Sequence, residues 1–262
     1  MASSNDAIKF LVVRAGNAEA FEKRLAKDPN VISYEEDLEQ YSISLVPTDS
    51  HYAGYQYSLQ SSTTGIESAW DITMGSHDVK VCVVDTGQYR AHQDLQGAHW
   101  AEWKDFVGRK RAPYDDNGHG THVTGTIGAV TNNDKGIAGI AQVSLAGAKV
   151  LSRTGSGTNS AVANGITWCA DIDSDIISLS LGGGFSQAVS NAVSYASSQG
   201  SLVVAAAGNA GPCTDCVSYP AKLPLALAVS CTDSLNRQCL FSSEGPEVDL
   251  AAPGKDIPST YP

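Results

Sequence analysis

The chain has 262 residues, of which 42% are hydrophobic and 17% charged, and its formal net charge is −11 at pH 7. This composition predicts a folded chain with a core of its own rather than a disordered one. The negative charge argues against nucleic acid or an anionic membrane as the main partner, and no apolar run reaches the roughly 20 residues that a membrane-spanning helix needs.

The start of the chain predicts a small strand–helix–strand unit. Residues 8–13 are apolar enough for a strand, Asn17 is a good helix N-cap, and Phe21 and Leu25 then fall on one helical face. Residues 41–45 alternate apolar and polar side chains, which indicates a half-buried strand. The unit is too short to bury much surface alone, so we expect it to pack on a larger partner. The alternative is that it forms the first layer of a single domain.

Strands and helices alternate in the main body of the chain. Apolar strands are predicted at residues 79–84, 142–151, 175–181 and 201–207, and helices are predicted to begin near Asn159 and after Ser186. Buried strands interleaved with helices indicate an α/β fold with a doubly wound, mostly parallel sheet covered by helices on both faces. Ligands of such sheets gather beyond the carboxyl ends of the strands.

A histidine surrounded by glycines suggests where the chemistry lies. Gly118 and Gly120 leave both sides of His119 bare, so another group can approach its ring closely. A histidine presented in this way can act as a general base, because its pKa lies near physiological pH. Asp85 and Asn209 each follow a predicted strand; an acid can orient the imidazole and an amide can donate to an oxyanion. Each residue alone is more often a cap or turn residue.

The six cysteines lie at positions 82, 169, 213, 216, 231 and 239. Sequence alone does not choose among their pairings. Cys213 and Cys216 form a single Cys-x-x-Cys pair, which is a weak zinc signal, so a loop disulfide or free thiols fit it better. The use of cysteine favours an oxidising compartment.

Several longer motifs stand in a fixed order along the chain. They are VVDTG at 83–87, NGHGTHVTG at 117–125, SLSLGG at 178–183, AAAGN at 205–209, YPAK at 219–222, FSSEGP at 241–246 and AAPG at 251–254. From about Pro47 to its last residue, the chain resembles the subtilisin-like serine proteases, the subtilase or peptidase S8 family. The resemblance implies a subtilisin-like fold and a serine-type endopeptidase with an Asp-His-Ser triad.

The resemblance assigns roles to individual residues. It implies that Asp85 orients the imidazole, that His119 is the general base and that Asn209 donates to the oxyanion, whereas His122 matches a structural histidine. Pro220 matches a proline that is cis in the family. The implied substrate-binding residues are Ser180, Leu181 and Gly182 on one edge of a groove, Ser156 and Gly157 on the other, and Ala206, Ala207 and Gly208 in the wall of the specificity pocket.

The resemblance also implies a structural Ca2+ site. Its side-chain ligands would be Asp94 and Asn133, with Asp49 contributing, and its backbone ligands would be the carbonyl groups of Thr131, Lys135 and Ile137. Oxygen ligands with one or two carboxylates suit Ca2+. The alternative is an ordinary polar loop.

The resemblance divides the chain into residues 1–46, similar to a shortened inhibitor-I9-like propeptide, and residues 47–262, the peptidase domain. It predicts cleavage between Tyr41 and Thr48, a polypeptide substrate, the propeptide itself as a partner, and a monomer. It further implies a secreted, endomembrane or extracellular protein, although no signal peptide is visible in this chain.

The chain departs from the family pattern near its end. The family's nucleophile lies in a Gly-Thr-Ser-Met-Ala-like segment beyond Pro253-Gly254, and residues 257–262 match the stretch just before it. Ser259 stands in the wrong segment to replace that serine. Without its hydroxyl no acyl intermediate forms, so we expect the chain as printed to be inactive and unstable. It is then either a truncated form of an active protease precursor or a pseudoprotease that binds peptides or regulates.

The cysteines also depart from the best-known bacterial members. Cys231 matches a half-cystine of some members, whose partner would lie outside this sequence; pairs Cys213–Cys216 and Cys231–Cys239 are the alternatives. Two other functions fit less well. A metal-dependent hydrolase using His119 and His122 lacks the helical His-Glu-x-x-His spacing, and dinucleotide binding lacks a G-x-G-x-x-G segment after the first buried strand.

Overall fold

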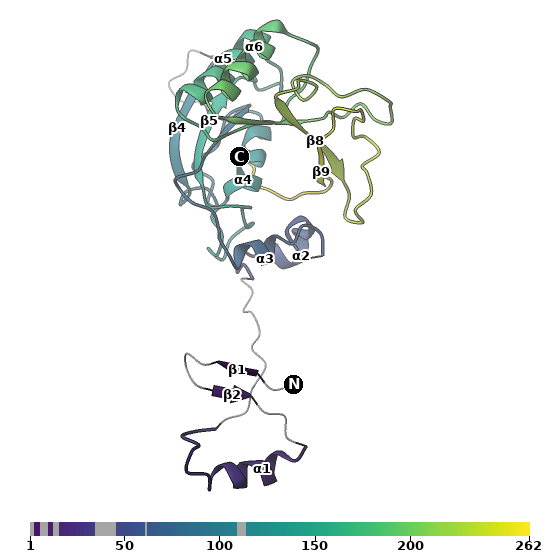
Figure 1. The fold of residues 1–262 in the computed structure, drawn as a ribbon. Helices are drawn as coiled ribbons and strands as arrows, with labels where there is room; N and C mark the ends of the chain where they lie inside the picture. The colour runs from purple at the N-terminus through teal and green to yellow at the C-terminus, as the bar shows by residue number, and fades with distance from the viewer. Residues whose placement is uncertain (1–2, 6–9, 13–15, 35–45, 61, 109–113) are drawn as a thin grey trace. The chain divides into compact units, whose positions relative to one another are not determined.

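The structure is a computed structural model that describes residues 3–5, 10–12, 16–34, 46–60, 62–108 and 114–262 (Figure 1). By the contacts within it, the chain divides into two compact units, Met1–Ile43 and Ser44–Pro262. No helix in the described ranges is long and apolar enough to cross a membrane.

The described part of the first unit contains a two-stranded antiparallel sheet and one helix. Strands β1 (Ser3–Asn5) and β2 (Phe10–Val12) pair with each other, and α1 (Ala18–Leu25) follows. The side chain of Asn17 caps α1 as predicted, accepting a hydrogen bond of 3.0 Å from the backbone N–H of Ala20. The strand predicted at 8–13 is confirmed for its described residues, whereas the one predicted at 41–45 lies outside the described residues. The polar sequence of β1 gave no strand signal.

In the described part of the second unit, seven strands form one sheet in which every neighbouring pair is parallel. The strands are β3 (Lys80–Asp85), β4 (His99–Asp105), β5 (Ser144–Lys149), β6 (Ile176–Leu179), β7 (Leu202–Ala206), β8 (Ala226–Thr232) and β9 (Leu250–Pro253), and their order is β4-β5-β3-β6-β7-β8-β9. The predicted parallel sheet is therefore confirmed. Strand β4, at an edge, is largely exposed and carries no apolar run, which is why it was not predicted.

The helices of this unit are α2 (Tyr52–Tyr55), α3 (Ile66–Trp70), α4 (His119–Gly128), α5 (Asn159–Asp171) and α6 (Gln187–Ser198), with a short 3-10 helix, η1 (Tyr57–Leu59). Figure 1 shows α5 and α6 side by side on one side of the sheet and α4 on the other. The predicted cap of α6 is present, because the Ser186 hydroxyl accepts from the N–H of Val189. Gly200, with a φ of 93°, then turns the chain away, as predicted.

Alternate residues of β3 supply the two halves of the core. Cys82 and Val84 belong to the apolar cluster that contains residues of α5 and α6. Val81 belongs to a second cluster, against which Ile127 of α4 packs. This alternation is the direct consequence of the two-residue period of a strand, and each fully buried side chain of this size contributes about 1.5–3 kcal/mol. The sheet is thereby fixed from both faces.

Every cysteine of the chain lies in the described residues and forms a disulfide. Cys213–Cys216 and Cys231–Cys239 are the two pairs proposed from the sequence. The alternatives, free thiols and a partner for Cys231 outside the sequence, are wrong for this structure. Cys82–Cys169 was not predicted; it joins β3 to α5 inside the core. The two cysteines are 87 residues apart, so no local spacing in the sequence indicates that they pair.

Candidate active site

A carboxylate and an imidazole meet where β3 ends and α4 begins. Asp85, the last residue of β3, is fully buried, and its Oδ1 lies 2.7 Å from Nδ1 of His119, the first residue of α4. The N–H of Thr86 also donates to this Oδ1, at 2.7 Å. Because Nδ1 carries the proton shared with Asp85, Nε2 of the ring is left free to accept one. This is the arrangement of an oriented general base.

Two glycines allow the helix to begin so close to the strand. Gly118 caps α4 with a φ of 107°, a conformation that favours glycine. A Cβ on Gly120 would lie 2.2 Å from the carbonyl oxygen of Gly87. The bare backbone predicted on both sides of His119 therefore serves the close approach of α4 to the end of β3.

A buried carboxylate organises the turn that leads into α4. Oδ1 of Asp115 accepts hydrogen bonds from the Thr86 hydroxyl and from the N–H groups of Asn117 and Gly118, and Oδ2 accepts from both the N–H and the hydroxyl of Thr121. Burial alone would raise the pKa of Asp115, but these hydrogen bonds outweigh it and lower the pKa below its ordinary value. Sequence reasoning missed this role; the Asp-Asp-Asn-Gly run, typical of turns, was its only signal.

The surroundings of the two histidines differ. The hydrogen bond to Asp85 raises the pKa of His119 above its ordinary value, against burial, which lowers it; the charges of Asp85 and Asp115 add to the rise. Burial lowers the pKa of His122, whose Nε2 lies 3.1 Å from the carbonyl oxygen of Ile257. His119 is thus suited to hold a proton, whereas the ring of His122 is hydrogen-bonded to the backbone.

A groove of about 470 Å3 opens beside His119. Both edges predicted for the substrate groove line it, namely Ser156 and Gly157 on one side and Ser180, Leu181 and Gly182 on the other. Gly183 next to this second edge exchanges backbone hydrogen bonds of 2.9 and 3.1 Å with Tyr219. The peptide bond between Tyr219 and Pro220 is cis, as the resemblance predicted. The structure therefore brings His119 and five of the predicted binding residues to one groove.

The remaining predicted residues lie further along the same edge of the sheet. Strands β6 and β7 are neighbours, and Asn209 follows the end of β7, where it is exposed. Its loop is held by hydrogen bonds from the Ser243 N–H to the Gly208 carbonyl, 2.9 Å, and from the Ala210 N–H to the Ser243 hydroxyl, 3.1 Å. The residues predicted for the pocket wall and the oxyanion donor, Ala206, Ala207, Gly208 and Asn209, are not among those that line the groove.

Ser259 is occupied elsewhere. Its hydroxyl donates to the carbonyl oxygen of His122, at 2.6 Å, and accepts from the hydroxyl of Thr126, at 3.2 Å. The next residue packs equally tightly, since a Cβ on Gly125 would lie 2.2 Å from the Thr260 hydroxyl oxygen. The hydroxyl of Ser259 is therefore bonded to the side of α4, which agrees with the expectation that it is not a nucleophile.

The predicted metal ligands include two buried acids. Asp94 is fully buried; its Oδ1 accepts from the Asn133 side-chain amide and its Oδ2 from the Ile137 N–H, both at 2.8 Å. Asp49 is 4% exposed, and its Oδ1 is buried without a hydrogen-bond partner. Within the described ranges no group of three or more His, Cys, Asp or Glu side chains is placed to hold a metal. The charge of Asp49 acts on Asp94, and an orphaned carboxylate oxygen near a second buried carboxylate fits an oxygen-only cation site.

These features can be compared with known proteins. Residues 76–261 match the family model described as the subtilase family, Peptidase_S8. Thermitase of Thermoactinomyces vulgaris is 47% identical over 218 residues, 82% of this chain and 76% of thermitase. The thermophilic serine proteinase of Bacillus sp. (strain AK1) is 42% identical over 98% of this chain and 63% of its own length. Subtilisin E of Bacillus subtilis (strain 168) is 40% identical over 92% of this chain and 61% of its own.

A solved structure agrees with these relatives. The crystal structure of a cold adapted subtilisin-like serine proteinase matches with a TM-score of 0.63 and 39% identity, over 70% of this chain and 65% of the other. The parallel α/β sheet, with its Asp–His pair at the carboxyl end of β3, has the fold of a subtilisin-like protein. The chain belongs to the subtilase family of serine peptidases. It spans less than two thirds of the length of two of the relatives it matches.

Proposed function

We propose that this chain supplies the acid, the base and the substrate groove of a subtilisin-like serine endopeptidase, which hydrolyses peptide bonds in polypeptides. The observation that carries the proposal is the 2.7 Å contact between Asp85 and His119, of which His119 lines the groove. A buried carboxylate on one imidazole nitrogen, with the other nitrogen free, is what a general base in acyl transfer requires.

His119 acts first as base and then as acid. Its Nε2 takes the proton of a serine hydroxyl as that oxygen attacks the carbonyl carbon, and it later gives the proton to the leaving amine. Asp85 keeps its negative charge and stabilises the imidazolium formed between these steps. The family pattern places the serine in a segment that the printed sequence does not contain, so we propose that the printed chain alone forms no acyl intermediate.

The groove holds the substrate as an added strand. The backbone near Gly157 and Gly182 is exposed along the groove, so it is available for main-chain hydrogen bonds to an extended peptide. Asn209 donates to the developing oxyanion, and Ala206, Ala207 and Gly208 form the pocket wall. These roles are supported by the parallel pairing of β7 with β6, because it puts the loop after β7 at the same edge of the sheet as the groove.

Three further assignments complete the proposal. A Ca2+ ion is held by Asp49, Asp94 and Asn133 with the carbonyls of Thr131, Lys135 and Ile137; the orphaned Oδ1 of Asp49 supports it. Residues 1–46 act as a propeptide that is cleaved between Tyr41 and Thr48. The protein is a secreted or endomembrane monomer, a location that the three disulfides support.

Casein cleavage tests the proposal, with a full chain that carries this sequence together with a Gly-Thr-Ser-Met-Ala-like segment. We expect cleavage, labelling by a serine-reactive fluorophosphonate, and loss of both in His119→Ala. The alternative is a pseudoprotease that uses the same groove to bind peptides. It predicts that unstructured peptides bind in the groove, measured by calorimetry, without any cleavage or labelling. Cleavage that survives in His119→Ala would contradict the assigned base.

A further inference from the structure

A buried lysine lies beside the proposed active site without any part in the chemistry described above. Lys149 is the last residue of β5 and is 5% exposed. It stands opposite Asp85 in the parallel pairing of β5 with β3. A buried ammonium is costly unless all its hydrogens find acceptors, so its presence at the end of the central strands requires an explanation.

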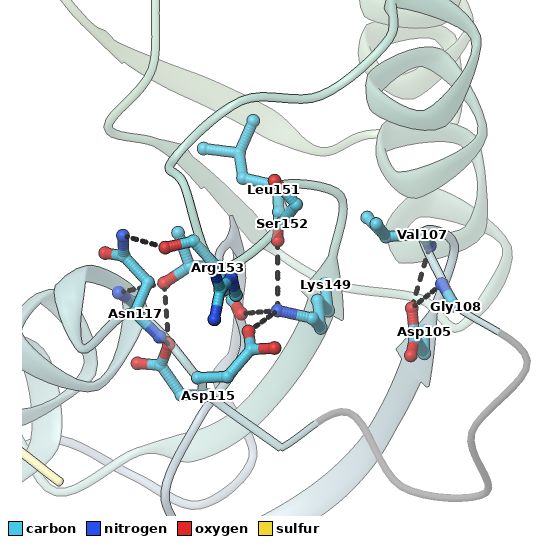
Figure 2. A network of polar contacts seen from close by, with 12 residues as sticks. Asp105, Val107, Gly108, Asp115, Asn117, Lys149, Leu151, Ser152 and Arg153 are labelled. Carbon is cyan, nitrogen blue, oxygen red and sulfur yellow. Dashed lines mark hydrogen bonds and ion pairs between the residues drawn. The ribbon is translucent and has the colours of Figure 1, made fainter.

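The three hydrogens of the Lys149 ammonium have three different acceptors. Nζ donates to the carbonyl oxygen of Thr86, to Oδ1 of Asp116 at 2.8 Å and to the carbonyl oxygen of Leu151 at 3.0 Å. Since a lysine has three donors and no acceptor, its hydrogen-bonding capacity is fully used. Figure 2 shows the ammonium between the turn that contains Asp115 and Asn117 and the segment from Leu151 to Arg153.

Each acceptor belongs to a segment that carries one part of the proposed site. Thr86 directly follows the acid, and its N–H donates to the Asp85 carboxylate. Asp116 lies in the turn that leads into His119 and α4. Leu151 lines the groove. One ammonium therefore joins the acid, the base and the groove wall.

The same segments are also joined without Lys149, but in pairs. The Thr86 hydroxyl connects the acid's segment to the turn through Asp115, at 2.9 Å. The Asn117 side chain connects the turn to the groove wall, donating to the Arg153 carbonyl oxygen at 3.0 Å. Lys149 is the contact that all three share. Asp105 of β4 is paired with Lys149 on the neighbouring strand. Its carboxylate accepts hydrogen bonds from the N–H groups of Val107 and Gly108 instead.

We propose that Lys149 is a positioning residue for the proposed active site: it holds the end of β3 and the turn before α4 in the register that points Asp85 at Nδ1 of His119. The inference rests on the proposed function of that pair. Lys149 does not touch the substrate and takes no proton. A neutral residue of similar length would fill the space but would remove the donor to the buried carbonyl oxygen of Thr86 and to the partly buried one of Leu151.

The test is the titration of His119, followed by NMR of its ring proton in the full chain that carries this sequence. Lys149→Met keeps the length of the side chain and removes its donors. We expect the pKa of His119 to fall towards its ordinary value, because Asp85 no longer faces the ring closely. The other titratable groups that act on this pKa are Asp85, Asp115 and His122, and the substitution leaves all three residues in the chain. Lys149→Arg, which restores a cation with several donors, should recover part of the shift.

The matched control is Lys80→Met. Lys80 begins β3 at the end remote from Asp85, and its ammonium also donates to a backbone carbonyl, the partly buried one of Ile172. We expect this variant to leave the pKa of His119 at its wild-type position. In a chain with measurable peptidase activity, Lys149→Met should also lower kcat on the order of 10²-fold with little change in KM, since it misplaces groups rather than weakening binding.

Two outcomes overturn the inference. One is a folded Lys149→Met protein in which the pKa of His119 and kcat match the wild type. If that variant does not fold by circular dichroism, Asp116→Ala replaces it, since the Asp116 side chain is 42% exposed and removes only one of the three anchors. Asp116→Ala should lower the pKa of His119 by less than Lys149→Met does. An unchanged pKa of His119 in Asp116→Ala is the second outcome that overturns the inference. If the wild type has no peptidase activity but the pKa of His119 still falls in Lys149→Met, the proposed function is refuted and the positioning role of Lys149 stands.

Discussion

The Nδ1 atom of His119 lies 2.7 Å from Oδ1 of Asp85, although 34 residues separate them along the chain. The contact depends on two kinds of local structure. Asp85 is fixed by the sheet, whereas His119 is fixed by a turn that a buried carboxylate and two glycines shape.

The Asp85–His119 contact should make stability depend on pH. The pKa of His119 is raised in the folded protein, chiefly by Asp85. The stabilisation by the charged imidazole is therefore fully present below its unfolded value of about 6.5 and is lost as pH rises through the folded pKa. We expect His119→Gln to lower the free energy of unfolding more at about pH 6 than at about pH 9, measured by urea denaturation. A deficit that does not vary with pH would mean that the contact is not charge-assisted.

Asp115 should contribute to stability with the opposite pH dependence. Its pKa is lowered in the folded protein, because five hydrogen bonds outweigh its burial. Its contribution is present above the unfolded value of about 3.9 and is lost as pH falls through the folded pKa. Asp115→Asn should lower the free energy of unfolding by about 3 kcal/mol near neutral pH. The difference from wild type should shrink in acid, and one that grows there would contradict the assignment.

Part of the sheet and helices α1, α5 and α6 could be predicted because they depend on short-range patterns, and the Asp85–His119 pair was implied by the family resemblance. Apolar runs predicted β3, β5, β6 and β7, and the glycines around His119 predicted that another group approaches its ring closely. Lys149 could not be predicted as part of the site, because its three acceptors come from segments far apart in the sequence. Cys82–Cys169 was missed for the same reason. Strand β4 has a polar, exposed pattern, so its pairing with β5 was visible only in three dimensions.

Gly120 should tolerate no side chain. A Cβ there would meet the Gly87 carbonyl oxygen at 2.2 Å, and that oxygen belongs to the backbone, so it does not move away as a flexible side chain would. Gly120→Ala should therefore lower the free energy of unfolding by about 1–3 kcal/mol, as overpacking does. The control is Gly54→Ala in α2, where no heavy atom lies within 4 Å of the new Cβ. It should be neutral or stabilise by up to about 1 kcal/mol. Equal effects of the two changes on the urea midpoint would refute the close approach.

The disulfides should differ in what they contribute. Cys82–Cys169 spans 87 residues and Cys213–Cys216 spans 3. If each bridge acts by restricting the unfolded chain, loop-closure entropy gives about 4.6 kcal/mol for the first and about 1.6 kcal/mol for the second. We expect Cys82→Ala/Cys169→Ala to lower the free energy of unfolding far more than Cys213→Ser/Cys216→Ser does. Urea denaturation of both double variants checks the order, and the reverse order would contradict it.

Calcium should raise the Tm of this protein through Asp49 and Asp94. An ion that binds only the folded state stabilises it by about 2.7 kcal/mol at a free concentration of 100 times its Kd. We expect Tm to fall when a chelator is added and to recover with Ca2+. Asp94→Asn should abolish that response, because it removes a buried carboxylate from the proposed ligand set. Asp134→Asn is the matched control, since Asp134 is exposed in the same loop with a φ of 62°, which asparagine tolerates. It should keep the full response; loss of the response in both variants, or in neither, would refute the assigned ligands.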